Sequence, residues 1–273
     1  MSSRAAAFFD LDKTIIATSS TLAFGRQFYV SGLINRRAMV KGAYAQLVYR
    51  LGGVDEDQMA RLRDDMARMI TGWDVQLVRD IVEETLHDLI DPLVYDEAAG
   101  LIELHQAAGR DVVIVSSSGA EVVGPIGDLL GADRVIATRM ATLDGRYTGD
   151  IDFYAAGPAK ADAMRELAAG DGYDLASSFA YSDSMTDLSM LEAVGHPYAV
   201  NPDRALRREA QRRDWPILDF RRPVPMRARF GRVDARWRPV LAGLGGVAVV
   251  AGVALAQRRL ARSQDRHAGA TNR

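Results

Sequence analysis

Short apolar runs alternate with longer segments of helical periodicity along most of the chain. Runs rich in Val, Ile, Phe and Ala predict buried strands, and apolar residues that recur every three to four positions predict helices between them. This alternation predicts an α/β fold with a Rossmann-like parallel sheet sandwiched by helices. The reactive edge of such a sheet lies at the carboxyl ends of its strands. The predicted strands are 5–11, 112–116, 134–138, 178–181 and 198–200, and the predicted helices include 98–108, 159–169 and 186–193.

One long segment interrupts this alternation. Residues 18–95 have an almost wholly helical pattern, so we predict a helical domain inserted after the first strand. A smaller exception is LDGRYTGDI (143–151), in which turn residues separate two short β-prone pieces. This pattern predicts a β-hairpin.

The composition is that of a globular protein, and it excludes several kinds of chemistry. The chain has 273 residues, 48% hydrophobic and 26% charged, which is enough for a core domain and an inserted one. A formal net charge of −2 gives no reason to expect nucleic acid as a partner. The sequence contains no cysteine, which excludes disulfides, thiolate catalysis and metal sites held by cysteine.

The C-terminal part of the sequence departs from the globular pattern. An Arg-rich linker, 221–238, precedes an apolar segment, 239–257, and a basic tail, 258–273, follows it. As a helix, its residues 239–256 would rise about 27 Å, close to the hydrocarbon thickness of a bilayer. We therefore predict a C-terminal transmembrane helix and a single-pass protein of the cell membrane. The alternative is a Gly- and Ala-rich helix packed on the core.

Two other features bear on this predicted anchor. The apolar stretch at the N-terminus is too short for an export signal, so we expect the catalytic domain to be cytoplasmic. Ala248, Gly252 and Ala256 recur at intervals of four, a spacing that would let two anchors pack as a homodimer.

Carboxylates follow two of the predicted strands. Asp10 and Asp12 lie at the carboxyl end of the first strand, and Asp183 and Asp187 follow the strand at 178–181. At one edge of a parallel sheet four such groups would repel one another, and a divalent cation such as Mg²⁺ would relieve the repulsion. Each pair alone is explained equally well by a turn or a helix cap. The combination in this order is what indicates a site.

The segments around these carboxylates resemble the four motifs of the haloacid dehalogenase superfamily of phosphohydrolases. FFDLDKT is similar to the first motif, VVIVSSS to the second, the Lys of GPAKADAM to the third, and YSDSMTDLSML to the fourth. The phosphoserine-phosphatase-like branch, subfamily IB, is the most similar. The resemblance implies a catalytic core made of 1–17 and 96–220, with 18–95 as the cap domain.

The resemblance also implies a mechanism. Asp10 would be the nucleophile that forms an aspartyl-phosphate, and Asp12 would be the general acid and base. Asp10, Asp183 and the backbone carbonyl of Asp12 would bind Mg²⁺. The carboxylate at Asp12 favours rapid turnover of the intermediate, which indicates a phosphatase and not an ion pump.

The remaining motif residues would bind the phosphoryl group. Ser116 and the backbone N–H of Ser117, at the start of a helix, would hold phosphoryl oxygens. Lys160 would neutralise charge on the nucleophile and the phosphoryl group, and Asp187 would position Lys160 or a metal-bound water. Thr14 would fix the loop and contact phosphate.

The substrate is less well defined than the reaction. Phosphoserine phosphatases carry a Glu nine residues after the nucleophile, where this chain has Ser19. We therefore predict a small phosphorylated metabolite as substrate, without strict phosphoserine specificity. A membrane-associated lysophospholipid or glycerol phosphate, a phosphotransferase reaction on the same scaffold, and a catalytically silent binding module are the alternatives.

Overall fold

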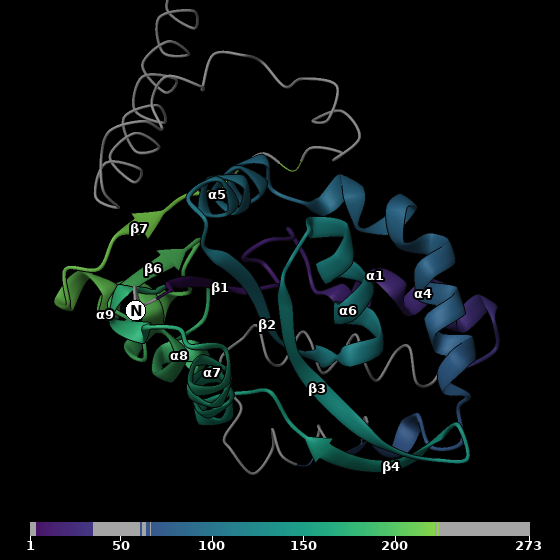
Figure 1. The fold of residues 1–273 in the computed structure, drawn as a ribbon. Coiled ribbons are helices and arrows are strands. Elements are labelled where there is room, and N and C mark those ends of the chain that lie inside the picture. Colours follow the sequence, from purple (N-terminus) through teal and green to yellow (C-terminus); the bar gives the residue numbers. More distant parts are fainter. Residues whose placement is uncertain (1–3, 35–60, 62–63, 66, 222, 224–273) are drawn as a thin grey trace, which may run out of the picture. The chain divides into compact units, whose positions relative to one another are not determined.

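The computed structural model describes residues 4–34, 61, 64–65, 67–221 and 223. They belong to the first of two compact units, Met1–Arg227, and the second unit, Ala228–Arg273, lies outside the described residues. Within the described part, seven strands form one sheet in the order β4-β3-β2-β1-β5-β6-β7 (Figure 1). The strands are β1 (Ala6–Asp10), β2 (Asp111–Gly119), β3 (Arg134–Leu143), β4 (Arg146–Phe153), β5 (Phe179–Ser182), β6 (His196–Val200) and β7 (Ile217–Leu218).

Helices connect these strands. Between β1 and β2 lie α1 and α4, which belong to the predicted cap segment, and α5, which follows it. Much of the cap segment lies outside the described residues, so the predicted cap boundaries stay a prediction. The α-helices are α1 (Ser20–Val30), α4 (Val75–Leu89), α5 (Asp96–Ala107), α6 (Ala120–Leu130), α7 (Pro158–Asp171), α8 (Leu188–Glu192) and α9 (Arg204–Arg212). The 3₁₀ helices are η1 (Asp91–Leu93), η2 (Leu175–Ser177) and η3 (Met185–Asp187).

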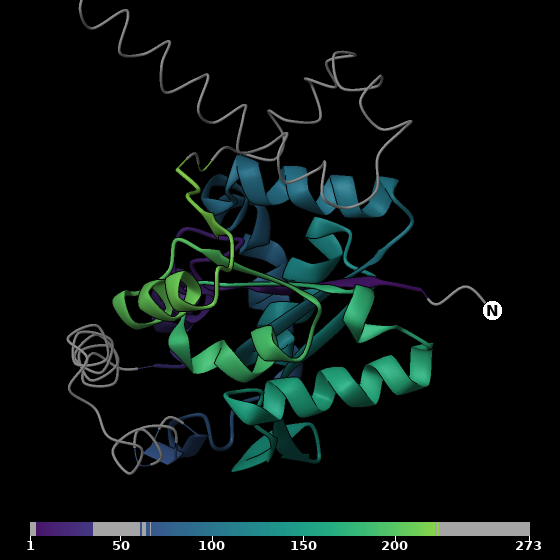
Figure 2. The ribbon, with the colours of Figure 1, turned by 90° about the vertical axis from the view of Figure 1, so that its left-hand side faces the viewer.

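All five residues of the central strand, β1, are buried. It pairs in parallel with β2 on one side and β5 on the other, so the carboxyl ends of all three strands meet at one edge. Phe8 packs in a core with residues of α7, α8 and α9, whereas Phe9 contacts His105 of α5 on the opposite face. Figure 2 shows α5 and α7 on opposite sides of the sheet. The predicted α/β fold with a parallel sheet and helices on both faces is confirmed.

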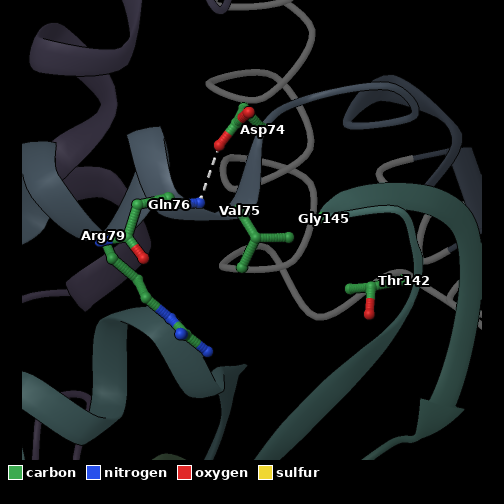
Figure 3. Close-up of a pocket in the computed structure, with 6 residues that line it drawn as sticks. All are labelled: Asp74, Val75, Gln76, Arg79, Thr142 and Gly145. Atoms are coloured by element: carbon green, nitrogen blue, oxygen red, sulfur yellow. Dashed lines mark hydrogen bonds between the residues drawn. The ribbon is translucent and has the colours of Figure 1, made fainter.

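The predicted hairpin is formed by β3 and β4, which pair antiparallel. A third segment joins it ahead of α4: Gly72 N–H donates to the Tyr147 carbonyl at 2.8 Å, and Val75 N–H donates to the Gly145 carbonyl at 2.9 Å. The start of α4 is thereby fixed to the hairpin. A shallow cavity of about 440 Å³ lies beside this junction (Figure 3) and contains none of the predicted site residues. It is lined by Asp74, Val75, Gln76, Arg79, Thr142 and Gly145.

The predicted fold class requires one correction, which concerns the transmembrane helix. No helix among the described residues is both long enough and apolar enough to cross a membrane. The longest of them, α4, has 15 residues and carries charged side chains, whereas a span needs about 20 mostly apolar residues. The predicted anchor, 239–257, lies outside the described residues, as does the basic tail. The transmembrane helix and the single-pass membrane localisation are accordingly not retained.

His105 is a buried titratable group in the α5 face of the core. Its Nε2 lies 2.8 Å from the Tyr181 hydroxyl, and Arg110 Nε donates to its Nδ1 at 2.8 Å. Burial, and then the charge of Arg110, lowers the pKa of His105 to about 3. His105 is therefore neutral in the folded protein at neutral pH, whereas in the unfolded chain its pKa is about 6.5.

This difference in pKa predicts a pH-dependent stability. Below pH 6.5 the unfolded chain binds a proton that folded His105 does not, so stability is present above this pH and is lost as the pH falls. The loss approaches about 1.4 kcal/mol per pH unit. We expect the free energy of unfolding, measured with urea between pH 6.5 and about 5, to fall more steeply for the wild type than for His105→Gln. His196→Gln, at an exposed position, is the control; parallel curves for wild type and His105→Gln would contradict the prediction.

Candidate active site

Three predicted site residues meet at the carboxyl edge of the sheet. Asp10 is the last residue of β1, Asp187 follows β5, and Lys160 lies in the first turn of α7. Lys160 Nζ is 2.7 Å from Asp10 Oδ1 and 2.9 Å from Asp187 Oδ2. All three side chains are buried. The Lys160 ammonium thus lies between two carboxylates inside the protein and not on the helix surface.

Two hydroxyl groups also donate hydrogen bonds to these carboxylates. Thr14 donates to Asp10 Oδ2 at 3.1 Å, and Ser182 donates to Asp187 Oδ2 at 2.7 Å. Thr14 is close to Asp10 because the chain turns after β1, where the N–H of Ile15 donates to the Leu11 carbonyl at 2.9 Å. Sequence reasoning did not single out Ser182, although it directly precedes Asp183 in the fourth motif.

Asp183 lies close enough to these groups to affect their charge. Its Oδ2 is 3.7 Å from Lys13 Nζ. Burial raises the pKa of Asp183 to about 7, an effect that Lys13 opposes and Asp187 reinforces. Lys13 has a φ of +64°, a region that residues other than glycine rarely occupy and that costs on the order of 1 kcal/mol or more. The turn after β1 thus places a cation beside Asp183 at the expense of backbone strain.

Burial raises the pKa of Asp10 to about 8, and the charges of Asp187 and Asp183 add to this effect against the attraction of Lys160. For Lys160, burial alone would lower the pKa, but the attraction of Asp10 and Asp187 outweighs it and raises the pKa above its usual value. Lys160 is therefore charged at neutral pH. Ionised together, the three buried carboxylates would carry more negative charge than Lys160 offsets.

This excess of negative charge and the oxygen donors fit a hard divalent cation. The resemblance implies two side chains, Asp10 and Asp183, and the backbone carbonyl of Asp12 as ligands. Within the part of the chain that the structure describes, no three acidic or histidine side chains are grouped so that they could hold a metal ion. A metal here would therefore depend on backbone oxygen, substrate or water to complete its coordination.

Asp12 faces a different set of partners from Asp10. The Ser20 N–H donates to Asp12 Oδ1 at 2.9 Å, and the Ser118 hydroxyl donates to Asp12 Oδ2 at 3.4 Å. Ser20 begins α1 and Ser118 lies near the end of β2. Sequence reasoning missed both serines, because nothing in their local pattern indicates contact with Asp12.

The end of β2 supplies the predicted phosphate-binding serines. Asp10 pairs with Val115, so Ser116 follows beside the carboxyl end of β1, and its side chain is buried. Ser117 is exposed at the same edge. The expectation that Ser117 lies at the start of a helix is wrong: β2 continues to Gly119, which is the N-cap residue, and α6 begins at Ala120. The N–H of Ser117 thus belongs to extended backbone.

The parallel strands bring two acidic pairs and a buried lysine together at the carboxyl edge of the sheet. This arrangement indicates a class of phosphohydrolase. The family model of the haloacid dehalogenase-like hydrolases matches residues 7–192. The chain belongs to this family. The predicted enzyme class, a phosphatase, is confirmed.

Several relatives are similar over nearly the whole chain. The inhibition of morphological differentiation protein of Streptomyces azureus is 62% identical over 254 residues, 92% of each chain. A probable phosphatase of Mycobacterium tuberculosis is 57% identical over 249 residues, 91% of this chain and 87% of the relative. A solved structure of a Bordetella pertussis protein of unknown function superposes with a TM-score of 0.69 at 29% identity, covering 80% of this chain and 99% of that one.

More distant relatives carry the names of two different phosphatases. The phosphoserine phosphatase of M. tuberculosis is 33% identical over 260 residues, 94% of this chain and 82% of the relative. The histidinol-phosphatase of Neisseria meningitidis is 31% identical over 223 residues, 79% of this chain and 98% of the relative. The two identities are nearly equal, so similarity along the whole chain does not select a substrate.

Proposed function

We propose that the protein hydrolyses a small phosphomonoester, with Mg²⁺ and through an aspartyl-phosphate on Asp10. The observation that carries this proposal is the buried contact of Lys160 with both Asp10 and Asp187. A cation held 2.7 Å from a carboxylate at a strand end offsets the charge that a phosphoryl group would bring to that carboxylate.

The reaction divides into two displacements at phosphorus. A carboxylate oxygen of Asp10 attacks phosphorus, and the bond to the ester oxygen breaks with its electron pair on that oxygen, which takes a proton from Asp12. Water then attacks the phosphorus and gives a proton to Asp12. The bond between Asp10 and phosphorus breaks, which returns the carboxylate and releases free phosphate.

The remaining residues bind and orient in this proposal. Thr14, which donates to Asp10 Oδ2, would keep the other carboxylate oxygen directed toward the substrate. Ser116 and the N–H of Ser117 would donate to phosphoryl oxygens. Asp187 would hold Lys160 in place through the 2.9 Å contact.

Mg²⁺ fits the donors described above. Asp10, Asp183 and the backbone carbonyl of Asp12 would hold it, and it would supply positive charge to the phosphoryl oxygens. The raised pKa values of Asp10 and Asp183 support this assignment, since a bound cation would favour the ionised form of both.

For the substrate we propose a compact phosphate ester of an alcohol. Phosphoserine and histidinol phosphate are both members of that class. Ser19, in place of the glutamate of phosphoserine phosphatases, removes the negative charge that would attract a substrate amino group. Two relatives are named for different substrates, and this supports a class of phosphate esters and not one compound.

Metal removal tests the proposed function. Release of phosphate from para-nitrophenyl phosphate by the full chain should rise at least about tenfold when Mg²⁺ is restored after chelation. Mg²⁺ should also raise the melting temperature, because it binds the folded state alone, and Asp183→Asn should abolish that rise. Equal rates with chelator and with Mg²⁺ would contradict the proposal. A phosphorylated acceptor in place of free phosphate would indicate a phosphotransferase.

A further inference from the structure

Ser118 joins three segments that are distant in the sequence. Its hydroxyl lies 3.4 Å from Asp12 Oδ2, 2.9 Å from the Ser20 hydroxyl and 3.2 Å from the Thr21 hydroxyl. Asp12 belongs to the turn after β1, Ser20 and Thr21 to the first turn of α1, and Ser118 to β2. Ser20 is completely buried and Ser118 is 9% exposed, so water competes little for these contacts.

The direction of these hydrogen bonds follows from the number of protons. A serine hydroxyl has one proton to donate and two lone pairs that accept, whereas a carboxyl oxygen that carries no proton only accepts, in the ionised and in the acid form alike. The proton of Ser118 therefore goes to Asp12 Oδ2, and the hydroxyl groups of Ser20 and Thr21 donate to the Ser118 oxygen. The backbone N–H of Ser20 donates to Asp12 Oδ1 at 2.9 Å. Both oxygens of Asp12 are thus held, each from a different segment.

We propose that Ser118 is a positioning residue that, together with the start of α1, holds the Asp12 carboxylate in the orientation needed for proton transfer to the leaving group. The inference rests on the proposed function, in which Asp12 is the general acid. Without the Ser118 hydroxyl, one Asp12 oxygen loses its donor, and the carboxylate can turn about its side-chain bonds. Proton transfer depends on such orientation.

The test compares two substrates of similar shape and different leaving groups. Nitrophenolate leaves readily without a proton, whereas phenolate depends more on the general acid. In Ser118→Ala, kcat/KM should fall about tenfold more for phenyl phosphate than for para-nitrophenyl phosphate. Because kcat/KM reports the first displacement, the later hydrolysis of the aspartyl-phosphate does not affect this ratio.

Three variants distinguish positioning from a general loss of stability. Ser178→Ala removes another buried hydroxyl, one that accepts from the Ala6 N–H and donates to the Asp174 carbonyl, and should leave the ratio of the two substrates unchanged. Ser20→Ala keeps the backbone donor to Asp12 and should change the ratio less than Ser118→Ala. Ser118→Thr retains a hydroxyl and should keep the wild-type ratio of kcat/KM for the two substrates. If Ser118→Ala does not fold, this ratio in Ser118→Thr is the measurement.

Two outcomes would overturn the inference. The first is an equal fall of kcat/KM for both substrates in Ser118→Ala. The second is a ratio of the two kcat/KM values that changes as much in Ser118→Thr as in Ser118→Ala. Either result leaves the proposed function intact as long as Asp10→Asn remains inactive. An active Asp10→Asn would instead reject the proposed function itself.

Discussion

Replacing Asp10 by Asn should lower turnover of para-nitrophenyl phosphate at least about 10³-fold, because a neutral amide is a poor nucleophile toward phosphorus. Asp10 is the residue on which Lys160 and Thr14 both converge, at 2.7 Å and 3.1 Å. Release of inorganic phosphate by the full chain in Mg²⁺ is the measurement. Activity within tenfold of the wild type would show that another group attacks phosphorus.

The same variant should remain folded. Burial raises the pKa of Asp10 to about 8, so the site opposes the charged form of this residue and accepts a neutral side chain of the same shape. Lys160 keeps Asp187 as its partner at 2.9 Å. We therefore expect the melting temperature of metal-free Asp10→Asn to equal or exceed that of the metal-free wild type. A large fall would mean that lost activity reflects unfolding, and the kinetic result could not then be assigned to chemistry.

Replacing Lys160 by Met should impair both stability and activity. Methionine retains the length of the side chain but leaves Asp10 and Asp187 buried without their shared cation. Removal of one partner from a buried ion pair costs about 3–5 kcal/mol, so the urea midpoint should fall correspondingly. Loss of the charge beside the phosphoryl group should also lower kcat/KM at least about 10²-fold under conditions where the variant is folded.

Arg165→Met is the matched control on the same helix. Arg165 pairs with Asp162 at 2.7 Å, but both side chains are more than half exposed, and such a pair contributes about 1 kcal/mol at most. This variant should keep wild-type activity and nearly wild-type stability. If Lys160→Met resembled Arg165→Met in both measurements, the buried lysine would have neither of the roles assigned to it.

The alternation of apolar and helical segments was enough to predict the parallel sheet, since β-branched runs and 3.6-residue periodicity reflect burial that is local to each element. The positions of the acidic pairs were predictable for the same reason, because the end of a buried strand is marked by the first charged residue after it. Lys160 was predictable from its motif but not from its helix, whose local pattern also fits an exposed side chain.

The apolar segment 239–257 illustrates the limit of such patterns. Hydropathy counts apolar residues in a window and takes no account of tertiary structure. The start of α6 shows a similar limit: the sequence pattern placed Ser117 at the start of a helix, but β2 continues to Gly119, and Ser116 and Gly119 pair with Ala137 and Thr138 of β3 on either side of a register shift. Local propensity is a weak guide where neighbouring strands supply hydrogen bonds.

The sequence by itself determined the alternation of strands and helices in the core, the acidic groups at the strand ends and the class of chemistry they support. Only the tertiary structure decided which hydroxyl groups surround them. Ser118 is 106 residues from Asp12, and Lys160 is 150 residues from Asp10. Contacts of this kind arise when separate strands pair and their ends are brought to one edge, and no local pattern of side chains encodes them.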